Sequence, residues 1–304
     1  KAGLWIEPEI IGTKCAEMLE YYDDDCFVSR NGKRIGVMNR YFLDYRNPKV
    51  IAYMTESIRR MIQDYGADYI KMDFNEDCGI GTDKDALTPG EGLESHARAY
   101  LAWIDRLRKT FPDVLFETCS SGGMRMDYAT LSHFSIVSTS DQTSYLRYPY
   151  IAGNVLSAVL PEQAAVWSYP VGTDTPGFTP TAEWINANIS DEQIIMNMIN
   201  SLLGRIHLAS HVELLHEGKR ALIKEGLDFY DGMTAFKKAE ERESAILRLF
   251  NTTDAAISLH MDVPAFKQAW LTNLAEVRER ELTVKDGKIT LEVPAKKILT
   301  IELA

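Results

Sequence analysis

Two acidic residues occupy comparable places in the sequence, each where an apolar segment ends. Asp73 lies near the end of "DYIKMDF", and Asp141 directly follows "FSIVSTS". Lys71 lies two residues before Asp73, so on an extended strand its ammonium points the same way as the carboxylate and favours the ionised acid. One acid held ionised and a second acid free to keep a proton are the pair that cleavage of a glycosidic bond requires.

Short apolar segments alternate with amphipathic ones, and this alternation predicts the elements that position the two acids. It is the pattern of repeated βα units around a parallel sheet. The clearest helix begins at Pro48, where proline suits a first turn, and its apolar residues form one stripe. Further helices are expected at 93–110, 147–160, 191–203 and 217–230. Six parallel strands are predicted, at 3–8, 68–74, 114–119, 134–140, 164–169 and 205–209.

The loops that follow these strands are longer than the loops that lead into them. Residues 78–92 and 172–181 are rich in Gly, Pro, Ser and Thr, whereas 65–68 and 111–113 are short connections. This asymmetry is typical of an α/β fold whose working face lies at the carboxyl ends of the strands, as in a (β/α)8 TIM-type barrel.

A closed barrel needs eight strands, two more than the six predicted. Either "NRYFLDY" (39–45) contains an overlooked strand, or the first units precede Lys1. The abrupt start at Lys1 favours an N-terminally incomplete barrel. We therefore expect two further barrel units to precede Lys1 in the natural protein, and we expect this chain to associate, because open sheet edges pair with other chains.

The pattern changes after the polar and charged stretch 232–243. From Ser244 onward, short alternating segments are separated by turn signals such as "KDGK" (285–288), which predicts a small antiparallel β domain. The expected domains are a partial catalytic barrel at 1–232 and a C-terminal antiparallel β domain at 244–304.

The net charge of −11 and a pI near 5.1 argue against nucleic acid and against an anionic membrane surface as partners. Four sparse, irregularly spaced cysteines support neither a disulfide framework nor a zinc knuckle, and a reducing cytoplasm fits them best. No run approaches the roughly 18 apolar residues of a membrane span. The expected ligand is a neutral or cationic small molecule, or there is none.

Four ordered motifs, "GLWIEPEI", "YIKMDFN", "ETCSSGGMRMD" and "SDQTSYLR", each lie at a predicted strand end. In this order they resemble glycoside hydrolase family 36, the melibiase-type α-galactosidases, over about residues 3–230. The resemblance implies a retaining α-galactosidase that needs no metal or organic cofactor and acts on a small carbohydrate substrate. Family members are often dimers or tetramers, so a homo-oligomer is expected.

The resemblance also implies residue roles. Asp73 would be the nucleophile and Asp141 the general acid/base, with their carboxyls about 5–6 Å apart. Lys71 would bond sugar hydroxyls, and Trp5 would offer an apolar wall to the ring. Cys119 and the Gly122 backbone would line the pocket beneath the galactose. The remaining substrate-binding residues implied by the motifs are Asn75 and Arg125.

Three departures from the family pattern bear on the sugar contacts. Met72 stands where family members usually carry Trp, and a sugar-binding Arg of the family aligns with Met38 rather than with Arg40. The family's paired acids that grip the galactose hydroxyls belong to a strand before "GLWIEP". The resemblance therefore implies that the natural protein carries an N-terminal β domain and the first two barrel units. Alternatives therefore stay open: an α-N-acetylgalactosaminidase, a raffinose-synthase-like transglycosylase, or a non-catalytic carbohydrate-binding remnant.

Other readings of single residues also remain. Asp141 could cap a helix, and Asp73 could merely pair with Lys71. A magnesium or manganese site is conceivable from four acids, and a zinc site from His207 and His211. Cys119 as a nucleophile would need a base such as His133. The acids in question are Glu7, Glu9, Glu76 and Asp77.

Overall fold

The computed structural model describes residues 1–304 except 172–180, 233–243, 252, 274–276 and 296. The chain divides into two compact units, Lys1–Ile223 and Lys224–Ala304. The domain boundary expected between 232 and 244 falls largely on residues outside the described ranges, so the limits 1–232 and 244–304 stay a prediction. The expected long loop at 172–181 also lies mostly outside them.

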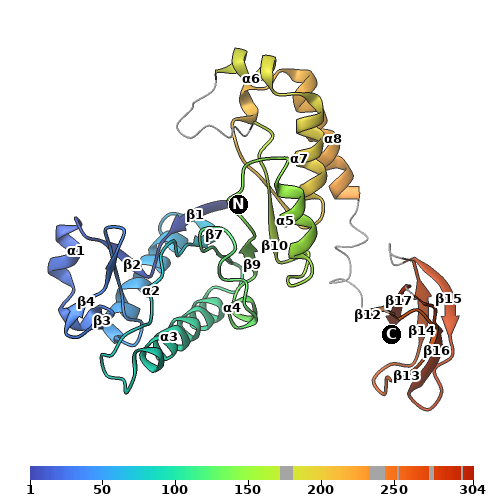
Figure 1. Ribbon diagram of the computed structural model, residues 1–304, viewed down its shortest axis with the longest axis horizontal. Coiled ribbons are helices and arrows are strands. Elements are labelled where there is room, and N and C mark those ends of the chain that lie inside the picture. Colours follow the sequence, from blue (N-terminus) through green and yellow to red (C-terminus); the bar gives the residue numbers. More distant parts are fainter. Residues whose placement is uncertain (172–180, 233–243, 252, 274–276, 296) are drawn as a thin grey trace. The chain divides into compact units, whose positions relative to one another are not determined.

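The first unit is built on one parallel sheet of six strands in the order β1-β7-β8-β9-β10-β11, curled into part of a barrel (Figure 1). The six strands predicted from the sequence are therefore confirmed, with ends that coincide or differ by at most two residues. Their bounds are β1 Ala2–Ile6, β7 Ala67–Met72, β8 Leu115–Thr118, β9 Ile136–Ser138, β10 Ala164–Ser168 and β11 Arg205–Leu208.

All five predicted helices are present, and the structure adds three short ones. The five are α2 Pro48–Gln63, α3 Pro89–Thr110, α5 Tyr148–Val155, α7 Asp191–Ser201 and α8 Glu217–Gly232; the additions are α1 Ala16–Tyr21, α4 Tyr128–His133 and α6 Ala182–Asn188. The helix starts follow from local chemistry. Asn47 precedes Pro48, and its side chain accepts a hydrogen bond from the Lys49 N–H. Thr88 precedes Pro89 in the same way, and its side chain accepts a hydrogen bond from the Glu91 N–H.

The core of this unit lies between β7 and the two long helices. Val50, Met54 and Ile58 form the buried face of α2, and they pack in one cluster with Ile70 of β7 and Trp103 of α3. The helix α2 ends close to the sheet because only three residues separate it from β7. This packing fixes the height of β7 in the sheet and thus the position of the residues that follow Met72.

Between β1 and α2 the chain forms an excursion that the sequence did not predict. It contains α1, a short 3-10 helix at Asp24–Cys26, and five short strands: β2 Ile10–Gly12, β3 Ser29–Arg30, β4 Lys33–Arg34, β5 Gly36–Val37 and β6 Arg40–Phe42. The strand at 40–42 pairs antiparallel with β2 and β5, so the stretch 39–45 does not supply a further barrel strand.

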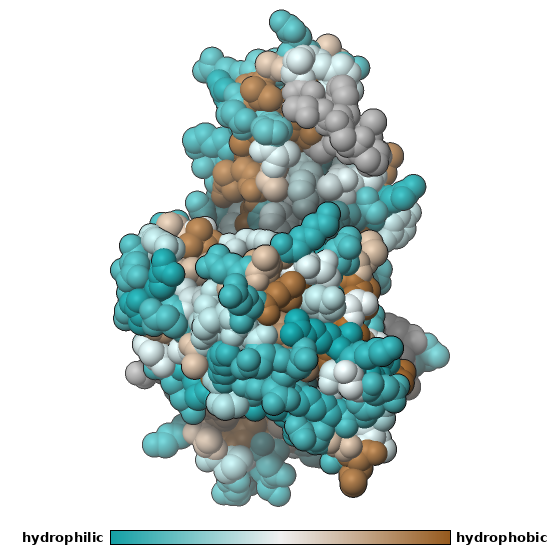
Figure 2. Space-filling model, turned by 90° about the vertical axis from the view of Figure 1, so that its left-hand side faces the viewer, coloured by the Kyte–Doolittle hydropathy of each residue, from teal (hydrophilic) through white to brown (hydrophobic). Residues whose placement is uncertain are grey.

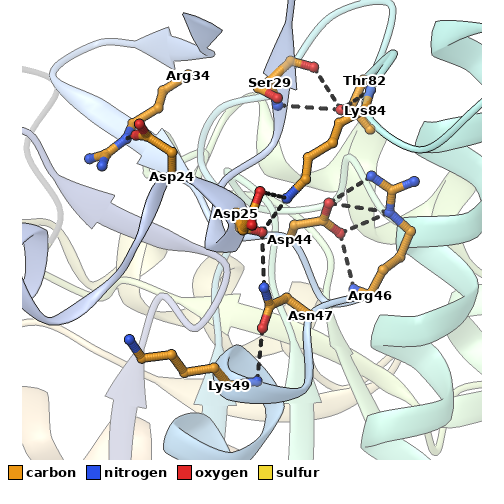
Figure 3. Close-up of polar contacts among 10 residues, drawn as sticks. All are labelled: Asp24, Asp25, Ser29, Arg34, Asp44, Arg46, Asn47, Lys49, Thr82 and Lys84. Atoms are coloured by element: carbon orange, nitrogen blue, oxygen red, sulfur yellow. Dashed lines mark hydrogen bonds and ion pairs between the residues drawn. The ribbon is translucent and has the colours of Figure 1, made fainter. Parts of the chain in front are cut away.

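The excursion is tied to the loop after β7 by the polar contacts drawn in Figure 3. Thr82 is fully buried; its hydroxyl donates to the Ser29 carbonyl at 2.7 Å and accepts from the Ser29 N–H at 3.3 Å. Lys84 Nζ lies 3.1 Å from Asp25 Oδ1. Asn47, which caps α2, also donates to the Asp25 carbonyl at 3.0 Å. The loop at 78–88 is thereby attached to the excursion beside the carboxyl end of β7.

The second unit contains two antiparallel sheets, which confirms the expected small β domain. One sheet has the order β12-β17-β14-β15 and the other pairs β13 with β16, and their inward side chains form a common core around Ile289 and Ile301. The bounds are β12 Ala245–Phe250, β13 Ile257–Asp262, β14 Ala269–Thr272, β15 Arg278–Leu282, β16 Lys288–Val293 and β17 Ile298–Leu303.

Figure 2 shows a face of the molecule on which hydrophilic residues dominate and apolar ones are scattered. Among the described residues, none of the helices combines the length and apolar character needed to cross a membrane.

Candidate active site

Asp73 lies directly after β7, and hydrogen bonds with three residues hold its backbone and its side chain in place. Its backbone N–H donates to the Ile6 carbonyl at 2.9 Å, which continues the pairing of β7 with β1. The Trp5 indole N–H donates to Oδ2 at 3.1 Å, and the Phe74 N–H donates to Oδ1 at 2.9 Å. The side chain is 8% exposed. The carboxylate is therefore fixed in one orientation at the carboxyl end of the sheet.

Lys71 lies on the same face of β7, one pleat below Asp73, as its spacing predicts. Its ammonium is 3.7 Å from Glu117 Oε1 and 4.6 Å from the centre of the Trp167 ring. The simple ion pair between Lys71 and Asp73 considered from the sequence is replaced by this pairing with Glu117 on β8.

Asp141 lies three residues beyond β9, with an exposed side chain. Desolvation of the carboxyl raises the pKa of Asp141; the positive charge of Lys71 opposes this and the negative charge of Asp73 adds to it. The three groups therefore act on one another electrostatically. The helix-cap reading of Asp141 is wrong, because α5 begins at Tyr148 with Arg147 at its N-cap position.

The loop that follows β8 packs against the backbone of Asp141. Gly122 has a φ of +81°, and a Cβ built on it would lie 2.7 Å from the Asp141 nitrogen and from the Ser140 Cα. Only glycine fits there without moving the acid. Ser120 donates to the Phe74 carbonyl at 2.7 Å, which joins the same loop to the residue after Asp73. One loop thus touches the chain beside both acids.

Cys119 is buried at the start of this loop, and its N–H donates to the Met72 carbonyl at 2.8 Å. Burial raises the pKa of the Cys119 thiol to about 11, and Lys71 offsets this only in part. Such a thiol is protonated at neutral pH and is a poor nucleophile. His133, considered as its base, lies instead 2.8 Å from Asp105.

Asn75 and Arg125 make contacts within the protein. The Asn75 amide donates to Glu7 at 2.8 Å and accepts from the Ser121 N–H at 3.1 Å. The Arg125 guanidinium pairs with the buried carboxylate of Glu9, with Nη2 at 3.1 Å from Oε2. It also lies 3.7 Å from the centre of the Phe74 ring.

The metal sites considered from the sequence are not supported by the positions of the described side chains. Within the described ranges, no three His, Cys, Asp or Glu side chains are arranged so that they could hold a metal ion. His207 lies with its ring centre 5.1 Å from that of Trp167, whereas His211 lies 2.9 Å from Glu213. The two histidines that are four residues apart therefore have separate partners.

Sequence reasoning missed Glu117 and Tyr169 on the concave face of the sheet. Glu117 is 1% exposed and pairs with Lys71. Tyr169 follows β10 and stacks on Trp167 with ring centres 5.8 Å apart. Alternation could have found Glu117, because it lies two residues before Cys119 and so faces the same side of the sheet.

Residues 1–164 match the Melibiase family, and residues 232–301 match the glycosyl hydrolases family 38 C-terminal beta sandwich domain. The chain is 32% identical over 179 residues to alpha-galactosidase AgaA of Geobacillus stearothermophilus, covering 56% of this chain and 24% of the relative. It is 28% identical over 145 residues to alpha-galactosidase Mel36A of Lactobacillus acidophilus, covering 47% of this chain and 20% of the relative.

Two solved structures show the same fold. The galactosidase domain of the alpha-galactosidase-sucrose kinase AgaSK superposes with a TM-score of 0.63 at 15% identity, covering 99% of this chain and 43% of that one. A GH36 alpha-galactosidase AgaA variant from Geobacillus stearothermophilus, in complex with stachyose, gives 0.61 at 17% identity, with 99% and 44% covered. The chain thus spans less than half of these structures and about a quarter or less of its curated relatives.

Proposed function

Because the chain belongs to the melibiase family of glycoside hydrolases, we propose that it is a retaining α-galactosidase that removes terminal α-linked galactose from oligosaccharides. The proposed substrate class follows from the relatives, which are named alpha-galactosidases and one of which is described in complex with stachyose.

The proposed mechanism has two displacements. In the first, a carboxylate oxygen of Asp73 attacks the anomeric carbon as the bond to the leaving oxygen breaks and that oxygen takes the proton of Asp141. In the second, ionised Asp141 removes a proton from water, whose oxygen attacks the anomeric carbon and releases Asp73. Two inversions leave the sugar with its original configuration.

One observation carries the assignment of roles: the two acids have unlike surroundings. Asp73 accepts hydrogen bonds from Trp5 and Phe74, which stabilise an oxygen nucleophile in a fixed orientation. Asp141 is exposed and has a raised pKa, to which Asp73 contributes. A raised pKa favours the protonated form of Asp141, which is the form that the general acid of the first step requires.

The sugar contacts follow from the same arrangement. We assign Lys71 to the sugar hydroxyls, Trp5 to the apolar face of the ring, and Cys119 with the Gly122 backbone to the floor of the pocket. Asn75 and Arg125 are proposed as substrate-binding residues too. Their protein contacts indicate that they would contribute partly by holding Glu7 and Glu9 in place.

Cellular context belongs to the proposal as well. The four cysteines are free thiols, which fits a reducing cytoplasm. We propose that the chain forms a homo-oligomer or associates with a protein segment that completes the barrel sheet. We propose neither nucleic acid nor a membrane as a partner.

The proposal is tested by hydrolysis of aryl α-galactosides by the purified chain beside three matched Asp to Asn variants. We expect Asp73→Asn to lose activity on all substrates, whereas Asp141→Asn keeps the first step only for aryl groups acidic enough to leave without a proton. Asp113→Asn is the control, since Asp113 is exposed in the loop before β8. The first sugar released, observed by proton NMR, should be the α anomer.

Three outcomes contradict the proposal. Release at the same background rate from wild type and Asp73→Asn would favour a non-catalytic carbohydrate-binding protein, which calorimetry with galactose would then reveal. Faster hydrolysis of an aryl α-N-acetylgalactosaminide than of the galactoside would assign the sister specificity. Transfer to sucrose in place of water would indicate the transglycosylase.

A further inference from the structure

A layer of polar side chains, one buried and two partly buried, lies on the face of the sheet that carries Asp73. Tyr69 and Lys71 project from β7 on the same face as Asp73, and Glu117 projects from β8 on the same face as Cys119. The parallel register pairs Lys71 with Glu117 directly. The layer is therefore continuous with the candidate active site.

Glu117 is the unusual member of this layer. It is 1% exposed, and a buried carboxylate is costly unless it is paired and hydrogen-bonded. Its Oε2 accepts a short hydrogen bond from the Tyr69 hydroxyl. Its Oε1 accepts no hydrogen bond from the residues that the structure describes, and it faces the Lys71 ammonium at 3.7 Å, a distance of charge attraction rather than of hydrogen bonding.

The Lys71 ammonium has attractive groups on more than one side. Glu117 and the Trp167 ring hold it from the sheet, with the ring centre 4.6 Å away. The charge of Lys71 also acts on Asp141 and Cys119 at the mouth. A long flexible side chain in this place would sample several positions unless its counter-charge were fixed, and the Tyr69 hydroxyl fixes that counter-charge.

We propose that Glu117 is a positioning residue: held by Tyr69, its carboxylate keeps the Lys71 ammonium beneath Asp73, oriented to bind the sugar. The inference rests on the proposed function. It adds Glu117, a residue to which the resemblance to the family gives no role. Glu117 acts through Lys71 and touches neither substrate nor the reacting atoms.

Burial makes the Glu117 carboxylate costly for the stability of the fold. Desolvation raises the pKa of Glu117, which the hydrogen bond from Tyr69 and the charge of Lys71 counteract. Replacing it by an amide removes the buried charge and keeps an acceptor for Tyr69, and the Lys71 ammonium that loses its partner is partly exposed, so the variant should still fold. The loss should appear in catalysis instead.

The test is a double-mutant cycle on kcat/KM for an aryl α-galactoside, using Glu117→Gln, Lys71→Met and both together. We expect Glu117→Gln to lower kcat/KM about 10- to 100-fold, as for a displaced binding group. The double variant should be no worse than Lys71→Met alone, because Glu117 acts only through Lys71. Glu302→Gln in the second unit is a matched control, a buried glutamate 3% exposed that pairs with Arg278, and should leave kcat/KM unchanged.

Crystal structures of wild type and Glu117→Gln give a readout independent of activity. The Lys71 ammonium should shift by roughly 1 Å or more in the variant while the backbone of β7 and β8 stays in place. An unmoved ammonium, or losses in the cycle that simply multiply, would overturn the inference. If wild type proves inactive the proposed function fails, and the crystallographic comparison still decides the role of Glu117.

Discussion

At the scale of single residues, the account depends on how Asp73 and Asp141 are held. Each acid is reached by the loop after β8, since Ser120 bonds the residue after Asp73 and Gly122 packs on the backbone of Asp141. This loop is the shared support of both acids. Its geometry allows a direct test.

Replacing Gly122 by alanine should displace Asp141. The new Cβ would meet backbone atoms at 2.7 Å, and the positive φ adds strain, so the Asp141 segment must move. We expect kcat/KM to fall by about 100-fold with little change in the far-ultraviolet circular dichroism spectrum. Gly153→Ala, where a Cβ meets nothing within 4 Å, is the control. Unchanged kcat/KM in Gly122→Ala would separate the loop from the acid.

His207 gives a prediction about pH and stability. Burial lowers its pKa to about 4, helped by the positive charges of Lys71 and Arg205. The unfolded chain, with an ordinary pKa near 6.5, binds more protons between these values. His207 therefore contributes stability above pH 6.5 that is lost as the pH falls towards 4, at most about 3 kcal/mol.

Urea unfolding at neutral and at mildly acidic pH measures this contribution. Wild type should lose more free energy of unfolding on acidification than His207→Gln, which cannot titrate there. Equal losses in the two proteins would show that folding does not lower the pKa of His207.

Asp73 and Asp141 could be singled out from sequence because each lies at a recognisable strand end, and the roles of these acids and of Lys71 were implied by the resemblance to the family. The pairing of Lys71 with Glu117 could not, since it depends on which strands are neighbours and on their register. The contact between Gly122 and Asp141 joins two loops, and no local pattern encodes such an approach.

At the scale of elements, α3 illustrates how a loop is attached to a helix start. Gly92 lies in its first turns, and a Cβ there would lie 2.0 Å from the Thr82 carbonyl oxygen. Thr82 is the buried residue that bonds Ser29 of the excursion (Figure 3). The glycine therefore permits the close packing of helix, loop and excursion.

Two glycines of the same helix should respond oppositely to alanine. Gly92→Ala should destabilise the chain by about 1–3 kcal/mol through overpacking. Gly90→Ala should be neutral or up to about 1 kcal/mol stabilising, because nothing lies within 4 Å and alanine is the better helix former. Equilibrium urea unfolding of both variants measures the difference, and the same sign for both would contradict the proposed packing.

The elements divide clearly into those that sequence predicts and those that it does not. All six parallel strands and the five longer helices carry strong periodicity, and all are present. The helices α1, α4 and α6 have only six or seven residues, too few for a helical period to show. The strands of the excursion have two or three residues each, and their pairing is set by tertiary contacts.

At the scale of the whole molecule, the outer strands of the parallel sheet are β1 and β11. Most side chains of β1 are exposed, including Leu4 at 39%. An outer strand with exposed apolar side chains is a site where another chain can pair.

We therefore expect this chain to associate in solution, and Leu4→Lys to weaken the association, because a charge on an outer strand opposes strand pairing. Sedimentation velocity over a range of concentrations measures it. Leu87→Lys, on a loop residue 93% exposed, is the control for added charge. A strictly monomeric wild type of 34.4 kDa would contradict the expectation.

The central claim is that Asp73 attacks the sugar, and trapping the covalent intermediate tests it most directly. A deoxyfluoro-galactosyl fluoride should react with the full chain and slow its own release, because the fluorine destabilises the transition states. Peptide mass spectrometry should then find the fluorosugar on the peptide that contains Asp73, and no label in Asp73→Asn. A label on any other residue, or turnover of aryl galactosides without a label on Asp73, would contradict the account.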